Sequence, residues 1–301
     1  MPKNKKLLAA MLVFLNTISF VVHAKNEQFV ATVSNISVVI QREMLEKGTY
    51  KSNCPVPPAR LREIKFTYYD FDGVEHTDGS IIVLDAAVEN VTEIFRELYD
   101  IKFPIAKIKR IELYNGDDEK SLADNNSVCF QCRSITNKPG IYSLHSYGLA
   151  IDINPWQNPY LGYYDLQQGT IKVLPPIGIN YINRTNLRAG MVEHVRNIFQ
   201  KNGFPIWGGA WNDPIDWQHI QTSRTVAKLL AVMTPDDAKI MFKLYVKNCQ
   251  LLNKIPDDDD TLIKLYKSES DKFMQYFHDN YENINNMDPV KALKLLQKEI
   301  S

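Results

Sequence analysis

The chain has 301 residues with 35 basic and 35 acidic side chains, so its formal net charge is zero at pH 7. This balance provides neither the basic surplus nor the basic stripe that phosphate binding requires, and we expect no nucleic-acid partner. The length suits one sizeable hydrophobic core with an appendage.

The first 24 residues have the features of a secretory signal peptide. Three lysines precede an apolar run, and "VHA" offers a small-residue cleavage site after Ala24. The alternative is a membrane anchor, but the run is short and is interrupted by Asn16, Thr17 and Ser19. We therefore expect an exported protein, periplasmic or secreted, without a membrane span once residues 1–24 are removed. Cleavage would leave 32 basic and 35 acidic side chains, a formal charge of −3.

The first half of the mature chain alternates helix and strand signals. Apolar residues at helical spacing predict a helical lead-in over residues 25–50. A hairpin is predicted next, with strands at 64–71 and 79–84 around an Asp72–Gly73 turn. Asp85 then resembles the N-cap of an amphipathic helix. Residues 108–114 are expected to form a further strand, and 115–140 a polar, turn-rich loop.

The second half begins with a short strand, "LAIDINP", that Pro155 ends. A long aromatic loop and a helix over 189–202 are expected to follow. Only helical signals remain after about residue 225, so we divide the chain into a leader 1–24, the lead-in 25–50, a core domain 51–225 and a helical C-terminal extension 226–301. The acids at 257–260 lack the spacing and the glycine of a calcium loop, and they suit the start of a helix.

Four cysteines remain after the leader: Cys54, Cys129, Cys132 and Cys249. Disulfides are the default in an exported protein, and four cysteines allow three full pairings. Cys129 and Cys132 form a CxxC pair, but no second CxxC accompanies it, so a structural zinc site is not favoured.

A metal site is indicated where a carboxylate interrupts an apolar strand. In "SLHSYGLAID" the alternation of a strand places Ala150, Asp152 and Asn154 on one face, away from the apolar face. His145 lies just before this strand, and Gly148 provides the freedom to fold it back over Asp152. One imidazole and one carboxylate make half of a zinc site, because catalytic zinc takes three protein ligands and keeps one open position.

The third ligand is best supplied by His219, in "WGGAWNDPIDWQHIQ". Asp216 precedes it by three residues and is suitably placed as the general base that hydrolysis needs. We expect the remaining histidines not to bind metal: a solvated His76 after the hairpin turn, a surface His194, and a structural His278 in the tail.

At this point the sequence resembles a known group of enzymes. Ser143, His145, Gly148, Ala150 and Asp152 match SxHxxGxAxD, and Asp216 to His219 matches D/ExxH. These are the two motifs of zinc D-alanyl-D-alanine carboxypeptidases and dipeptidases and of L-alanyl-D-glutamate endopeptidases, which are related in fold to lysostaphin-type enzymes and the hedgehog amino-terminal domain. The similarity extends over roughly residues 50–222.

The resemblance implies an α+β fold, with a small antiparallel sheet that carries the site, flanking helices, and the C-terminal helical extension added. It implies one Zn²⁺ per chain, held by His145, Asp152 and His219, with Asp216 as the general base. Asp stands where many members have Glu, one methylene longer.

Further roles follow from the same resemblance. Arg133 would donate to the scissile carbonyl oxygen, although a surface ion pair is the alternative. Ser143 and Trp217 would contact substrate, with Ser143 equally suited to a plain turn. Cys54 and Cys132 lie in family-like blocks and would form one bridge, which leaves Cys129 and Cys249 as the other pair.

Two functions are compatible with these features. The first is an exported zinc peptidase that acts on peptidoglycan peptides. The second is a non-catalytic wall-binding or partner-binding module that keeps zinc for structure. Asp216 favours the enzyme, because a binding module has no need of a carboxylate beside an open zinc position. The sequence determines neither the bond that is cut nor the oligomeric state, for which we expect a monomer. The extension could pack on the core or gate the cleft.

Overall fold

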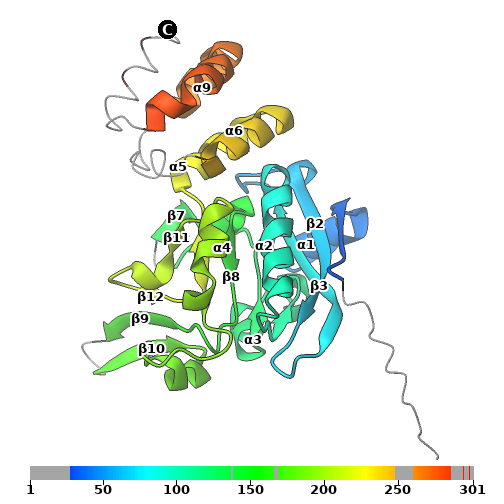
Figure 1. The fold of residues 1–301 in the computed structure, drawn as a ribbon, viewed down its shortest axis with the longest axis vertical. Helices are drawn as coiled ribbons and strands as arrows, with labels where there is room; N and C mark the ends of the chain where they lie inside the picture. The colour runs from blue at the N-terminus through cyan, green and yellow to red at the C-terminus, as the bar shows by residue number, and fades with distance from the viewer. Residues whose placement is uncertain are drawn as a thin grey trace, which may run out of the picture.

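In the described residues the fold consists of three three-stranded antiparallel sheets and two two-stranded sheets, with helices around them (Figure 1). The structure is a computed structural model, and it describes residues 28–136, 138–165, 169–247 and 260–285, with Lys294 and Lys298 beyond them. The expected leader, residues 1–24, and Cys249 lie outside this range. The α+β class with a helical C-terminal part is confirmed.

The first sheet is formed by β1 (Ala31–Asn35), β2 (Leu61–Tyr69) and β3 (Glu75–Leu84). The predicted hairpin is confirmed as β2 and β3, and its turn includes Gly73 at φ +73°. The helical lead-in over 25–50 is wrong in its first part, because Ala31–Asn35 pairs antiparallel with β2. Only α1 (Val38–Glu46) is helical there, and it buries Ile40 and Met44.

One long helix, α2 (Val88–Asp100), covers this sheet. It buries the predicted apolar face, except that Val88 is only partly buried. Asp85 does not cap the helix, since its carboxylate pairs with Arg60. The predicted strand at 108–114 is wrong beyond its first residue, because β4 (Lys107–Ile108) pairs in parallel with β5 (Asn126–Ser127) and a 3₁₀ turn follows at Ile111–Tyr114.

The polar segment after it is partly regular, with α3 (Asp118–Ala123) and the hairpin β6 (Ser134–Ile135) and β7 (Lys138–Tyr142). The expected aromatic loop contains a second hairpin, β9 (Tyr160–Asp165) and β10 (Thr170–Leu174). The helix expected over 189–202 is shorter, with a 3₁₀ turn at Val192–His194 and α4 (Arg196–Lys201).

Two further sheets carry the residues singled out in the sequence. In one, β13 (His219–Gln221) lies between β11 (Ile206–Trp207) and β8 (Ala150–Asp152). In the other, β9 lies between β10 and β12 (Ile215–Asp216). The chain therefore brings residues about 70 positions apart in the sequence into neighbouring strands.

The C-terminal part is helical, with α5 (Arg224–Val232), α6 (Pro235–Lys247), α8 (Thr261–Ser268) and α9 (Ser270–Asn285). It shares the core of the rest of the protein, and Phe242 and Tyr245 are fully buried in that core. Arg60, near the start of β2, donates to the carbonyl oxygens of Leu230 and Met233 at the end of α5. Helices α5 and α6 are thus packed onto the domain.

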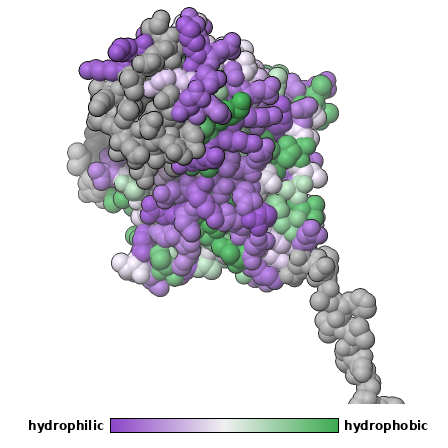
Figure 2. All heavy atoms as spheres, turned by 45° about the horizontal axis from the view of Figure 1, so that its top comes forward, coloured by the Kyte–Doolittle hydropathy of each residue, from purple (hydrophilic) through white to green (hydrophobic). Residues whose placement is uncertain are grey.

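The face seen in Figure 2 is mostly hydrophilic, with small separate hydrophobic areas. None of the helices in the described part of the chain has the length and apolar content that crossing a membrane requires.

Candidate metal centre

His145 is fixed by a short 3₁₀ turn, Leu144–Tyr147, that precedes β8. The Ser143 hydroxyl accepts from the His145 backbone N–H at the start of this turn, at 3.4 Å. Gly148 ends the turn at φ +66°, and a Cβ there would lie 2.7 Å from the backbone nitrogen of Leu84. The glycine is required by both the backbone conformation and the close packing. As a result His145 is folded back over β8 and is buried.

Asp152 and His219 face each other across two strands. The β8–β13 register pairs Asp152 with His219 directly. On the other edge of β8, the backbone N–H and carbonyl groups of Asp152 both form hydrogen bonds with the backbone of Val128. Paired residues on one face of an antiparallel pair have Cβ atoms about 5 Å apart, which suits two ligands of one ion. The backbone therefore places both side chains before any ligand is bound.

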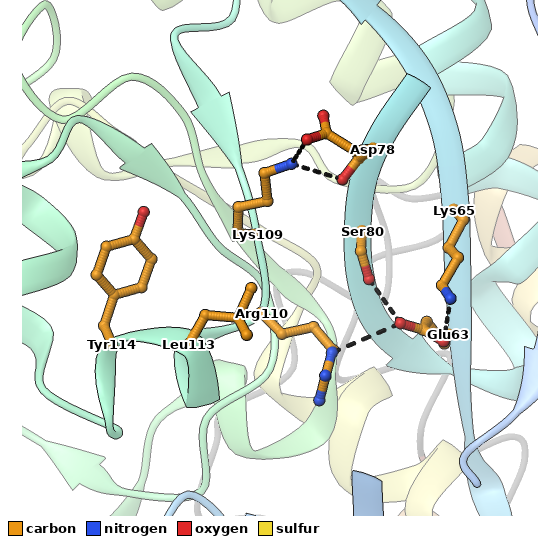
Figure 3. A pocket seen from close by; sticks show the side chains of 8 residues that line it. All are labelled: Glu63, Lys65, Asp78, Ser80, Lys109, Arg110, Leu113 and Tyr114. Carbon is orange, nitrogen blue, oxygen red and sulfur yellow. Dashed lines mark hydrogen bonds and ion pairs between the residues drawn. The ribbon is translucent and has the colours of Figure 1, made fainter. Parts of the chain in front are cut away.

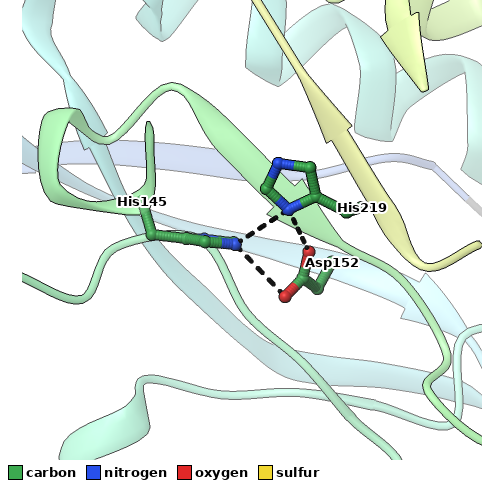
Figure 4. Close-up of side chains that lie close together, drawn as sticks. All are labelled: His145, Asp152 and His219. Carbon is green, nitrogen blue, oxygen red and sulfur yellow. Dashed lines mark hydrogen bonds and ion pairs between the residues drawn. The ribbon is translucent and has the colours of Figure 1, made fainter. Parts of the chain in front are cut away.

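The three side chains converge as the sequence predicted (Figure 4). His145 Nε2 lies 3.2 Å from Asp152 Oδ2, and His219 Nδ1 lies 3.0 Å from Asp152 Oδ1. The two imidazole nitrogens are 3.1 Å apart. Each residue offers one ligand atom, these atoms all lie within 4.8 Å of one another, and all three residues are buried.

The other nitrogen of each imidazole faces a hydrogen-bond acceptor. His145 Nδ1 contacts the carbonyl oxygen of Cys129, and His219 Nε2 lies 2.7 Å from Gln221 Oε1. In neutral imidazoles those nitrogens must carry the protons, so the lone pairs of His145 Nε2 and His219 Nδ1 point at each other and at Asp152. Two lone pairs and a carboxylate that converge in a buried space form a favourable site for a cation. The donor set of two nitrogens and one oxygen fits zinc.

The ionisation of the cluster supports this assignment. Burial would raise the pKa of Asp152, but the two imidazoles hold it far below its usual range. Burial would lower the pKa of His219, but the hydrogen bond to Asp152 and the charges of Asp152 and Asp216 raise it above its ordinary value. The site thus holds a negative charge and attracts positive charge.

Asp216 lies beside this cluster, on β12. Burial and the charge of Asp152 raise the pKa of Asp216 to about 7. Its Oδ1 is buried and has no hydrogen-bond partner within the described residues. A buried carboxylate with a pKa near neutrality and a free oxygen has the properties of a general base.

The other expected site residues have structural partners. Arg133 is partly exposed; its Nε lies 3.2 Å from Gln131 Oε1 and 3.3 Å from Asp118 Oδ2. Its charge still lowers the pKa of Asp216, so it acts electrostatically on the site. Trp217 is buried, with the Arg184 guanidinium 4.9 Å from its ring. The ring of Trp211 lies 5.5 Å from the ring of His219.

The expected bridge between Cys54 and Cys132 is present, and it joins residues 78 positions apart. The other expected pairing is wrong, because Cys129 is a free thiol. Cys129 is 1% exposed and packs in the core, and its carbonyl oxygen contacts Nδ1 of His145. Burial raises the pKa of this thiol above its usual range.

Two contributions to the site were not foreseen from the sequence, the Gln221 amide and the Cys129 carbonyl oxygen. Gln221 could have been found, because residues two apart in a strand share a face, and Gln221 follows His219 by two. The carbonyl of Cys129 leaves no signal in side-chain identity. Of the three histidines set aside, His194 is exposed, as expected. His76 is not a solvated loop residue, because it lies on β3 with its Nε2 2.7 Å from Asp70 Oδ2, and His278 is exposed and not structural.

A hollow of about 580 Å³ on the β2–β3 sheet is separate from this site and shares no lining residue with it (Figure 3). Its charged side chains are paired: Lys109 with Asp78, and Lys65 and Arg110 with Glu63, while Arg110 also pairs with Glu43 and Glu112 outside the hollow. Because these charges are already satisfied within the protein, we assign it no ligand.

Comparison with known proteins supports the resemblance seen in the sequence. Residues 136–222, under a third of the chain, match the family model described as D-alanyl-D-alanine carboxypeptidase. This range includes the His145–Asp152–His219 cluster and Asp216, whereas Arg133 lies just before it. The matched segment is similar to this family, and it contains the three residues that could hold a metal ion. Searches of curated proteins and of solved structures found no match.

Proposed function

We propose that this protein is an exported zinc-dependent peptidase that hydrolyses peptide bonds in peptidoglycan stem peptides. The observation that carries the proposal is the convergence of His145 Nε2, Asp152 and His219 Nδ1, beside a buried carboxylate that has a free oxygen. A disulfide in the domain agrees with export, because disulfides persist in oxidising compartments.

His145, Asp152 and His219 would hold the ion, and Zn²⁺ would act as a Lewis acid that polarises the scissile carbonyl and acidifies a water. Asp216 would take a proton from the attacking water and return it to the leaving amine. Arg133 would stabilise the oxyanion that develops on the carbonyl oxygen.

Asp216 also separates this function from the alternative, a non-catalytic wall-binding module. Its Oδ1, which has no hydrogen-bond partner among the described residues, is a cost to folding, because a buried polar atom without a hydrogen bond loses its hydration. A module that only binds gains nothing from that cost, whereas a hydrolase uses the free oxygen as a base.

The test is mass spectrometry of muropeptides after digestion with the zinc-loaded protein. Loss of a terminal residue would identify a carboxypeptidase, and internal cuts an endopeptidase. Asp216→Asn should lower kcat by about two to four orders of magnitude, the usual contribution of a general base. Asp236→Asn, at an exposed position in α6, is the matched control. Equal turnover by wild type and Asp216→Asn would refute the assignment of the base.

A further inference from the structure

Gln221 is the last residue of β13 and lies two positions after His219. Side chains two apart in a strand point to the same face, so the Gln221 amide lies alongside the His219 ring. Its Oε1 lies 2.7 Å from His219 Nε2, on the side of the ring opposite to Asp152.

This contact determines which ring nitrogen of His219 carries the proton. An amide oxygen only accepts, so the Nε2 of a neutral imidazole must be protonated to bond to it. Nδ1 is then left with its lone pair, 3.0 Å from Asp152 Oδ1 and 3.1 Å from His145 Nε2. If the amide were reversed, Nε2 would accept, Nδ1 would carry the proton, and the ring could not act as a ligand at that atom.

The acceptor on the other imidazole is a backbone group, the carbonyl oxygen of Cys129. Side-chain substitution cannot remove it. Gln221 is therefore the tautomer-fixing group at this cluster that mutagenesis can reach.

We propose that Gln221 is a positioning residue that holds His219 as the Nε2-protonated tautomer and so presents Nδ1 to a divalent cation. This inference rests on the metal site of the proposed function. A neutral amide also adds no charge to the cluster, whereas a carboxylate partner would add a negative charge and make the imidazole more basic.

Competition titration of Zn²⁺ against a chromophoric chelator tests this without any turnover assay. Gln221→Leu should bind Zn²⁺ about 10- to 100-fold more weakly than wild type, the usual effect of losing such a partner. Gln221→Glu keeps an acceptor oxygen and should bind at least as tightly as wild type. Gln41→Leu is the matched control, because it removes a glutamine of α1 whose amide donates to the Ile36 carbonyl oxygen, remote in sequence from the ligands.

Long-range ¹H–¹⁵N NMR of the histidine rings, on metal-free protein at pH 8, reads the tautomer directly. Wild type should show His219 protonated at Nε2, and Gln221→Leu a mixture of tautomers. A wild-type spectrum with the proton on Nδ1 would overturn the inference, and this result needs no variant to fold. Wild type that binds Zn²⁺ no better than Gln221→Leu would also overturn it, whereas wild type without zinc affinity would refute the metal site itself.

Discussion

His219 lies directly opposite Asp152 in the β8–β13 strand pair, although 67 positions separate them in the sequence. Strand register is strongly specified where one face of the sheet is buried, because a slip of one residue would turn every side chain of the strand to the other face. The fold therefore determines two ligand positions through the backbone, and the turn that ends at Gly148 adds His145 as the third.

We predict that the purified protein binds one Zn²⁺ and that His145→Ala, Asp152→Ala or His219→Ala each abolishes this binding. Zinc that binds only the folded state stabilises it, by about 2.7 kcal/mol at a free concentration 100 times Kd. Elemental analysis and thermal unfolding with and without EDTA measure both effects. His194→Ala, at an exposed position, should keep full zinc content and the EDTA-sensitive rise in Tm. A ligand variant that retains wild-type zinc content would contradict the site.

These ligands could be predicted because they stand out against their surroundings. Asp152 interrupts an apolar strand, and His219 follows a carboxylate at a spacing that matches a known motif. The geometry that makes them ligands was not predictable, since it depends on the strand register and on the acceptors at Gln221 and Cys129. Neither register nor a backbone carbonyl is encoded locally in residue type.

Strand β1 shows why the lead-in was misjudged. The expected helix rested on the helical spacing of apolar residues across 25–50, of which β1 contains Val33. Val33 is 47% exposed because β1 is an edge strand that buries little. Pairing with β2 decided the outcome over the local pattern. The second cysteine pairing failed for a related reason, because packing buries Cys129 completely as a free thiol.

The Cys54–Cys132 bridge should contribute to the stability of the domain. It closes a loop of nearly 80 residues, and a bridge of this length typically adds about 2–4 kcal/mol by restricting the unfolded chain. The variant with both cysteines changed to serine should lose this amount in denaturant unfolding. Cys129→Ala, which removes a free thiol, should retain the bridge in non-reducing peptide mapping. A peptide map that joins Cys129 to another cysteine would contradict the assignment.

Arg60 should couple α5 to the N-terminal sheet. It pairs with Asp85 at 2.6 Å and donates to two carbonyl oxygens at the end of α5, all in a buried setting. Arg60→Ala would leave the Asp85 carboxylate buried without its partner, at a cost of about 3–5 kcal/mol. Urea unfolding measures the loss, and Arg62→Ala, whose guanidinium bonds only nearby carbonyls, is the control. Similar losses in both variants would show that Arg60 does not anchor α5.

Glu112 should make stability depend on pH in a way that is independent of the metal centre. Burial raises the pKa of Glu112, and this effect exceeds the lowering by the Thr49 hydroxyl, which donates to Oε1, and by Arg110, whose Nη1 lies 3.5 Å from Oε2. Because the folded state holds the proton more tightly than the unfolded state, this stabilisation is complete below the ordinary carboxyl pKa of about 4 and is lost as pH rises through the folded pKa.

Glu112→Gln stays neutral, so its free energy of unfolding relative to wild type should increase with pH between about 4 and 8. Chemical unfolding of the metal-free protein across this range measures the difference, and Glu119→Gln, at an exposed position in α3, should run parallel to wild type. A difference between Glu112→Gln and wild type that does not change with pH would mean that Glu112 ionises as freely in the folded chain as in the unfolded one.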